Sequence, residues 1–155
     1  MTITPVEAHT IARETMAKHG LTGWTYTLDN AVRRSGQCNH RTRTISMSRK
    51  IIVAMDTEQF MNTLHHEIAH ALVGPGHGHD QVWRDMHYAL GGNGRRQSQV
   101  DTTHITPKWL GTCPSGHTIS RHRLTKRAKN GSCPKCSNVF NKAYMFNWTE
   151  LVPAR

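Results

Sequence analysis

The segment from Leu64 to Trp83, LHHEIAHALVGPGHGHDQVW, places five histidines around one glutamate, Glu67. Imidazole nitrogens are common zinc ligands, and a catalytic zinc usually takes three protein ligands and keeps a fourth position open. His66 and His70 are four residues apart, so on a helix they share one face and can reach the same ion. His65 points away from that face, and we expect it to pack or to contact solvent.

Residues 66–70, HEIAH, therefore match the H-E-x-x-H pattern. In this pattern the two histidines bind zinc, and the glutamate lies beside the open coordination position. There Glu67 can take a proton from water held by the metal and pass it to a leaving amine. The expected reaction is metal-assisted hydrolysis of a peptide bond, and the alternative is a chance match in a chain that holds 12 histidines.

His77 and His79 compete for the third ligand position. The breaker Gly74-Pro75-Gly76 turns the chain back after the helix, so either histidine can approach the metal. His79 is favoured because it stands at the start of the next helix and because Trp83, four residues later, can hold that helix start by packing. His77, in a glycine-rich loop, stays as the alternative.

The elements that must position these residues are helices and short strands. Capping-box patterns at Thr4 and at Asp56 predict a helix over residues 5–19 and a second helix through Val73. Another helix is expected over about residues 80–90, before two glycines. Three short segments rich in β-branched or aromatic residues predict two or three strands: TGWTYTLDN, AVRRSGQCN and RTRTISMS.

The apolar residues of these elements predict where the core lies. In the strand segment RTRTISMS, Ile45 and Met47 share one face. In the helix that carries HEIAH, apolar residues recur every four positions and form the stripe expected to pack on the sheet: Phe60, Leu64, Ile68 and Leu72.

The order TISMS, HEIAHAL, GHDQVW and LGG resembles the SprT-like metalloproteases, relatives of the Spartan protease. The resemblance extends from about residue 5 to the C-terminus. It implies a zincin-like catalytic domain, and it places the third zinc ligand at His79, because the family's His-Gly-x-x-Phe/Trp element then ends at Trp83. Asp80 stands where glycine is more usual in that element, which keeps His77 open. The resemblance also implies a protease that cuts proteins attached to or stalled on DNA.

A second set of metal-ligand residues lies in the last third of the chain: Cys113, His117, Cys133 and Cys136. The sequence CPSGH, fifteen residues and then CPKC predict a closed Cys₃His structural zinc site in a module too small to bury its own core. The alternative is two unrelated Cys-Pro turns. SprT-like proteins commonly end in a zinc ribbon, more often with Cys-x-x-Cys at both ends. The remaining cysteine, Cys38, is expected to be buried or partly buried.

The formal net charge of +10 is concentrated near the C-terminus. Residues 1–94 hold nine Lys and Arg against eight Asp and Glu, whereas residues 95–155 hold eleven against two. Basic segments attract polyanions, so nucleic acid is the expected partner and a solvated basic surface is the alternative. The residues expected to contact phosphates lie between the two halves of the second ligand set: Arg121, Arg123, Lys126, Arg127 and Lys129. Tyr144, Phe146 and Trp148 are expected to form one packed face of a terminal strand.

These features predict an α+β protein with two parts. A zincin-like metalloprotease domain over residues 1–94, with helices packed on a short β-sheet, is followed by a linker over 95–108 and a small, β-rich, basic zinc ribbon over 109–155. The expected cofactors are one catalytic and one structural Zn²⁺. The leading function is a SprT-like zinc endopeptidase that acts on proteins bound or crosslinked to DNA.

Two other functions compete with it. One is a non-proteolytic nucleic-acid-binding zinc protein that uses the protease-like domain as a scaffold, and the other is a hydrolase of another substrate with a deep, closed pocket. No apolar run approaches membrane-spanning length, and the N-terminus lacks the order of a secretory signal. We therefore expect a cytoplasmic protein that is not secreted and has no membrane partner. Association with the nucleoid and a location in the cytoplasm of a host cell are further options.

Overall fold

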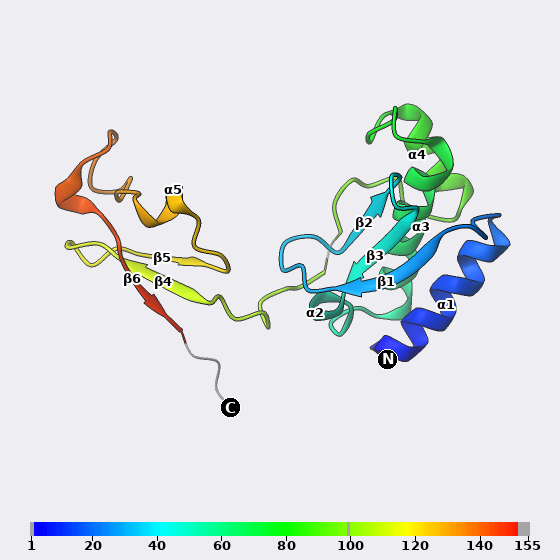
Figure 1. Cartoon of the computed structure of the whole chain (residues 1–155), viewed down its shortest axis with the longest axis horizontal. Helices are drawn as coiled ribbons and strands as arrows, with labels where there is room; N and C mark the ends of the chain where they lie inside the picture. Colours follow the sequence, from blue (N-terminus) through cyan, green and yellow to red (C-terminus); the bar gives the residue numbers. More distant parts are fainter. Residues whose placement is uncertain (1, 99, 152–155) are drawn as a thin grey trace. The chain divides into compact units, whose positions relative to one another are not determined.

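The computed structural model of the chain describes residues 2–98 and 100–151, and the chain forms two compact units, residues 1–102 and 103–155 (Figure 1). The expected linker is divided between them, because residues 95–102 group with the first unit and residues 103–108 with the second. None of the helices in the described ranges combines the length and the apolar character that crossing a membrane requires.

The first unit is a mixture of helices and a small sheet. Its helices are α1 (Pro5–Lys18), α2 (Arg49–Ile52), α3 (Thr57–Val73) and α4 (Gln81–Ala89). Its strands are β1 (Thr25–Asp29), β2 (Gly36–Asn39) and β3 (Thr44–Ser48). The three expected long helices and all three strand segments are confirmed. The short helix α2 was not predicted from the sequence.

The starts of α1 and α3 are fixed by the predicted capping boxes. At α3, the Asp56 carboxylate accepts a hydrogen bond from the Gln59 backbone N–H at 2.7 Å, and the Gln59 side chain accepts one from the Asp56 N–H at 3.1 Å. At α1, the Thr4 hydroxyl accepts from the Glu7 N–H at 3.2 Å. These bonds satisfy N–H groups that have no partner within the helix. A defined first residue of α3 also sets which face carries HEIAH.

The sheet has the strand order β1-β3-β2, with β3 parallel to β1 and antiparallel to β2. Register pairs Tyr26 with Ile45 and Ile45 with Cys38, so these three side chains share one face. Ile45 and Met47, which were predicted to share one face, are both fully buried. Strand β2 lies at an edge of the sheet, against α3.

The core of the first unit lies between this sheet face and α1 and α3. Phe60, Leu64 and Ile68 on α3 are fully buried, as expected, but Leu72 is 38% exposed, so its place in the stripe was wrong. Leu72 lies in the last turn of α3, one residue before the helix ends at Val73.

The second unit is a three-stranded antiparallel sheet with the order β5-β4-β6. Its elements are β4 (Trp109–Thr112), β5 (Thr118–Arg121), α5 (Lys126–Lys129), the 3₁₀ helix η1 (Lys142–Tyr144) and β6 (Asn147–Glu150). The expected strand face of three aromatics is wrong, because Tyr144 belongs to η1 and the strand begins after Phe146. Trp148 packs over Gly111, where an added Cβ would lie 2.9 Å from the indole ring.

Candidate metal centres

Three histidine rings converge in the first unit. The Nε2 atom of His79 lies 2.9 Å from Nε2 of His66 and 3.2 Å from Nε2 of His70. Nitrogens bound to one tetrahedral zinc at about 2.1 Å would lie about 3.4 Å from one another. The three residues therefore fit a single zinc ion, with two ligands from α3 and one from the loop before α4.

Contacts with the backbone orient the two helical histidines. The carbonyl of Arg95 accepts a hydrogen bond from the ring of His66, and the carbonyl of His77 accepts one from the ring of His70. Since Nε2 of each ring faces the cluster, Nδ1 is the nitrogen left for the carbonyl. Burial lowers the pKa of His66 to about 3 and that of His70 to about 4, and neighbouring histidines add to both shifts. Both rings are therefore neutral, the form that binds metals.

Trp83 on α4 contacts all three rings. It is fully buried, stacks on His70 with ring centroids 5.3 Å apart, and meets His66 and His79 at 4.6 Å each. Its indole N–H donates to the backbone carbonyl of His66 at 3.3 Å. Trp83 thus holds α4 against α3 at the cluster, a larger role than the support of the helix start that the sequence predicts.

The other histidines of the segment lie outside the cluster. His77 pairs instead with Asp80, its Nδ1 2.7 Å from a carboxylate oxygen. His65 packs edge to face with His19, with ring centroids 6.2 Å apart. His87, to which the sequence assigned no role, is fully buried with its centroid 5.5 Å from that of His66. His87 lies four residues after Trp83, and residues at this spacing share one face of a helix. This spacing could have indicated from the sequence that His87 lies on the same face as Trp83.

Glu67 lies beside the cluster, in contact with β2. Its side chain is only 6% exposed, and burial raises its pKa to about 8, against the positive charge of Arg34 and a hydrogen bond from the Cys38 backbone. Gly36 makes room for it, because a Cβ there would lie 2.6 Å from Glu67 Oε1. The edge strand therefore positions a buried carboxylate beside the histidine cluster.

Cys38 is half-buried, as expected, with its Sγ 3.7 Å from Nε2 of His40. Burial, together with the negative charge of Glu67, raises the pKa of this thiol to about 12. The thiol is therefore protonated at neutral pH and is not an activated nucleophile.

Two open clefts meet at the histidine cluster. The first, of about 450 Å³, is lined by Glu67 and by four arginines: Arg33, Arg34, Arg95 and Arg96. The second, of about 350 Å³, is lined by His40, His70 and His77 among others. Four residues line both clefts: Gly36, His66, Glu67 and His79. The histidine cluster therefore lies where two clefts with different linings meet.

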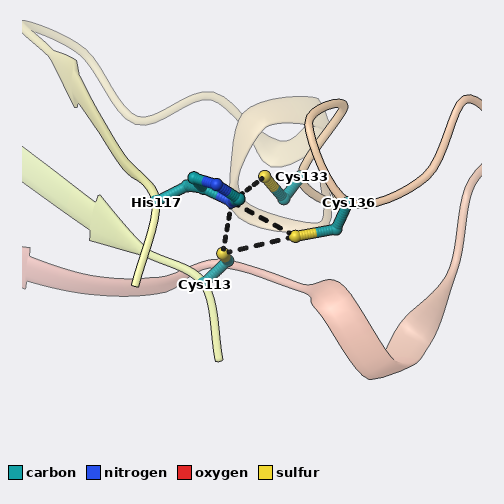
Figure 2. Close-up of side chains that lie close together, drawn as sticks. All are labelled: Cys113, His117, Cys133 and Cys136. Atoms are coloured by element: carbon teal, nitrogen blue, oxygen red, sulfur yellow. Dashed lines mark hydrogen bonds between the residues drawn. The ribbon is translucent and has the colours of Figure 1, made fainter. Parts of the chain in front are cut away.

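Three cysteines and a histidine converge in the second unit, and Figure 2 shows their side chains pointing toward a common centre. Cys113 Sγ lies 3.8 Å from Cys136 Sγ and 3.6 Å from His117 Nδ1. Cys133 Sγ lies 3.6 Å from the same nitrogen. Ligands of a tetrahedral zinc would lie about 3.8 Å apart for two sulfurs and about 3.6 Å apart for sulfur and nitrogen. The cluster fits zinc and is compatible with a zinc ribbon.

Two turns bring these four donors together. Cys113 follows β4 and His117 precedes β5, and Gly116 between them takes a φ of 82°, which favours glycine. Cys133 is tied to the last residue of η1 by its N–H, which donates to the Tyr144 carbonyl at 2.9 Å. Although burial opposes it, hydrogen bonds from the backbone at His117 and Ser115 lower the pKa of Cys113 to about 7. A lower pKa favours the thiolate that binds metal.

The five basic residues expected to contact nucleic acid are all exposed. Arg121 ends β5 and Arg123 follows it, whereas the other three lie on the short helix α5: Lys126, Arg127 and Lys129. The helix α5 was not predicted from the sequence, and Thr125 caps it by accepting a hydrogen bond from Ala128 N–H at 3.2 Å. The helix presents three positive charges to solvent.

Comparison with known protein families places the first unit. The model of the SprT-like family matches residues 9–104, more than half of the chain and nearly all of the first unit. No curated protein and no solved structure matches the sequence. The match includes α3 with both helical histidines, the His79 loop and α4. The chain therefore belongs to the SprT-like family.

Proposed function

We propose that this protein is a zinc-dependent endopeptidase with a zincin-like catalytic domain. The observation that carries the proposal is the convergence of three histidine Nε2 atoms beside the buried carboxylate of Glu67. His66, His70 and His79 would hold the catalytic zinc, because these three rings converge whereas His77 lies beside Asp80. When bound, zinc lowers the pKa of a coordinated water and polarises the carbonyl to be attacked.

Glu67 acts as the proton carrier of the proposed reaction. Its carboxylate accepts the proton of the attacking water and delivers it to the nitrogen of the leaving amine. Gly36 and the Cys38 N–H hold the carboxylate in place against β2. A positioned base that needs no large movement between the two transfers is what this reaction requires.

The surroundings of the cluster favour a polypeptide substrate. Within the described residues, strand β2 pairs only with β3, so its other edge offers backbone N–H and C=O groups to an extended chain. The two clefts next to β2 open to solvent. A long substrate can pass through them, whereas a hydrolase of small molecules would need a closed pocket.

The second unit supports an action near DNA. Residues 103–155 hold nine basic residues against one acidic one, and five of the basic residues lie exposed on β5, α5 and the loop between them. Cys113, His117, Cys133 and Cys136 would hold a structural zinc that keeps this basic surface in shape. Contacts to phosphates would be independent of base sequence and would weaken with salt. The proposed substrates are proteins bound or crosslinked to DNA.

The Glu67→Gln variant tests the proposal. General acid and base catalysis contributes about 10²- to 10⁴-fold, so cleavage should fall by that factor while zinc content stays unchanged, because Glu67 is not a ligand. Cleavage is measured by gel electrophoresis on a DNA-binding protein, with and without DNA, and on an unfolded protein. Zinc is measured by mass spectrometry.

Each outcome of this experiment has a clear meaning. Loss of cleavage with full zinc, and faster cleavage of the DNA-bound substrate by the wild type, would support the proposal. Full activity in Glu67→Gln would contradict the mechanism. A wild type that binds DNA and cuts neither substrate would favour the alternative of a nucleic-acid-binding scaffold.

A further inference from the structure

Four arginines surround one of the two clefts at the histidine cluster. Arg33 and Arg34 lie between β1 and β2, and Arg95 and Arg96 follow α4. All four are exposed and line the cleft that Glu67 and His79 also line. Glu67 is the one acidic residue of that lining within the described ranges. The cleft therefore carries a strong positive charge beside the proposed zinc.

These charges act directly on the proposed catalytic groups. Arg34 acts electrostatically on Glu67, and Arg96 acts on His79. Arg34 is also held in place, because its guanidinium lies 2.8 Å from the Asp29 carboxylate. Two of the four arginines are thus near the position where a substrate bond would be cut.

The second cleft lacks this charge. Among the described residues, its lining contains no lysine or arginine, and it consists of histidines and uncharged residues beside Glu67. Both clefts share His66, Glu67 and His79. A substrate chain that crosses the metal site would meet arginines on one side of the cleaved bond and none on the other.

We propose that the arginine-lined cleft binds an acidic segment of the substrate polypeptide on one side of the cleaved bond. This inference rests on the proposed endopeptidase function. The planar guanidinium presents a fork of donors that matches carboxylate geometry. Aspartate and glutamate side chains would be bound there, and lysine-rich segments would be repelled.

The lining favours a peptide over a nucleic acid. Single-stranded nucleic acids are usually held by aromatic side chains on which bases stack, combined with positive charge. Within the described residues, no Trp, Tyr or Phe lines this cleft, whereas Val32, Ile51 and Val100 do. Aliphatic side chains between arginines suit a polypeptide with alternating acidic and apolar residues.

Peptide binding to the zinc-loaded Glu67→Gln variant tests the inference without relying on turnover. The probes are short fluorescein-labelled peptides with aspartates in the N-terminal half, with aspartates in the C-terminal half, or with asparagines at all of those positions. Binding is followed by fluorescence anisotropy at low salt. One of the two acidic peptides should bind about tenfold more tightly than the asparagine peptide, and the other should not.

Charge reversal in the cleft provides the second arm. The substitutions Arg33→Glu and Arg96→Glu are added to the Glu67→Gln variant, and together they should abolish the preference for the acidic peptide. In the Glu67→Gln variant alone, added salt should weaken that preference. The matched control is Arg13→Glu with Arg41→Glu, which changes the net charge equally at two exposed arginines outside both clefts. The control should keep the preference.

Two results would overturn the inference. The first is equal binding of all peptides. In the second, the acidic and asparagine peptides bind alike, and the variant with Arg33→Glu and Arg96→Glu loses binding to an oligonucleotide. That result would mean that the arginines bind the phosphates of a nucleic acid. These results differ from failure of the proposed function, which the cleavage assay with Glu67→Gln reports separately.

Discussion

The two candidate metal-ligand clusters of this chain differ in the number of their donors and in what lies beside them. In the first unit, three imidazoles converge next to a carboxylate, Glu67, and between two open clefts. In the second unit, four donors converge, and among the described residues none of them lines either cleft. Three protein ligands leave a tetrahedral zinc open to substrate, whereas four ligands close it. The first arrangement suits catalysis, and the second suits structure.

The clusters also differ in how much the fold depends on them. In the first unit, α3 packs through Phe60, Leu64 and Ile68 independently of the histidines. Within the described part of the second unit, the only buried hydrophobic side chains are those of Cys113 and Cys133. A small domain without its own apolar core depends on a metal for stability. Removing a zinc ligand should therefore unfold the second unit, whereas the first unit should stay folded without its zinc.

The largest effect is expected from Cys133→Ser. Structural zinc binding contributes about 10–16 kcal/mol in small metal-dependent modules, so the second unit should unfold while the first stays folded. Zinc content should fall from two ions per chain to one, and the NMR signals of residues 109–151 should collapse toward random-coil shifts. Cys38→Ser is the control, because Cys38 lies outside the cluster, and it should keep both ions. A folded second unit in Cys133→Ser would show that this unit does not depend on its metal for stability.

His79→Ala should remove the zinc of the first unit without unfolding that unit. Zinc content should again fall to one ion, and peptidase activity should drop by about 10³-fold or more, because several kcal/mol of transition-state stabilisation are lost. Far-UV circular dichroism should not change. His77→Ala is the matched control and should keep both zinc and activity, since His77 pairs with Asp80. If His77→Ala loses the ion and His79→Ala keeps it, the ligand assignment must be reversed.

Gly36→Ala separates the position of the base from metal binding. The new methyl group would lie 2.6 Å from Glu67 Oε1 and would displace the carboxylate. A displacement of about 1 Å can lower the rate by about 10²-fold, so activity should fall to that extent with zinc retained. Gly23→Ala is the control, because its nearest atom, Arg43 Nη1, lies at an ordinary 3.7 Å. Unchanged activity in Gly36→Ala would mean that the strand does not position Glu67.

The smallest effect concerns pH and the metal-free first unit. Burial lowers the pKa of His66 to about 3 and that of His70 to about 4, whereas histidine in an unfolded chain titrates near 6.5. Between these values the unfolded chain binds protons that the folded chain does not, so stability present at pH 7 is lost as the pH falls toward 4. Urea unfolding of the chelated protein, followed by tryptophan fluorescence at several pH values, measures this loss.

The variant His66→Gln with His70→Gln is the comparison for the pH experiment. It lacks both buried imidazoles, so its stability should depend less steeply on pH over the same range. Equal pH dependence in the two proteins would show that other groups cause the loss.

Residues close together in the chain could be interpreted from the sequence. The capping residues Thr4 and Asp56 predicted the starts of α1 and α3, and the four-residue recurrence predicted the buried face of α3 up to Ile68. These features are local, because caps and helical faces depend on neighbours within a few residues. The same holds for HEIAH, whose two histidines share a face in any helix.

Features that depend on distant residues required the tertiary structure. The sequence favoured His79 and kept His77 as the alternative, and in the structure His79 meets the other two rings and contacts Trp83, which packs against α3. It could not show Gly36 against Glu67, because that contact depends on how β2 lies on α3. Nor could it show that Arg33 and Arg96 line one cleft. Spacing along the chain sets helical faces and ligand types, but long-range packing sets which side chains from separate elements share one site.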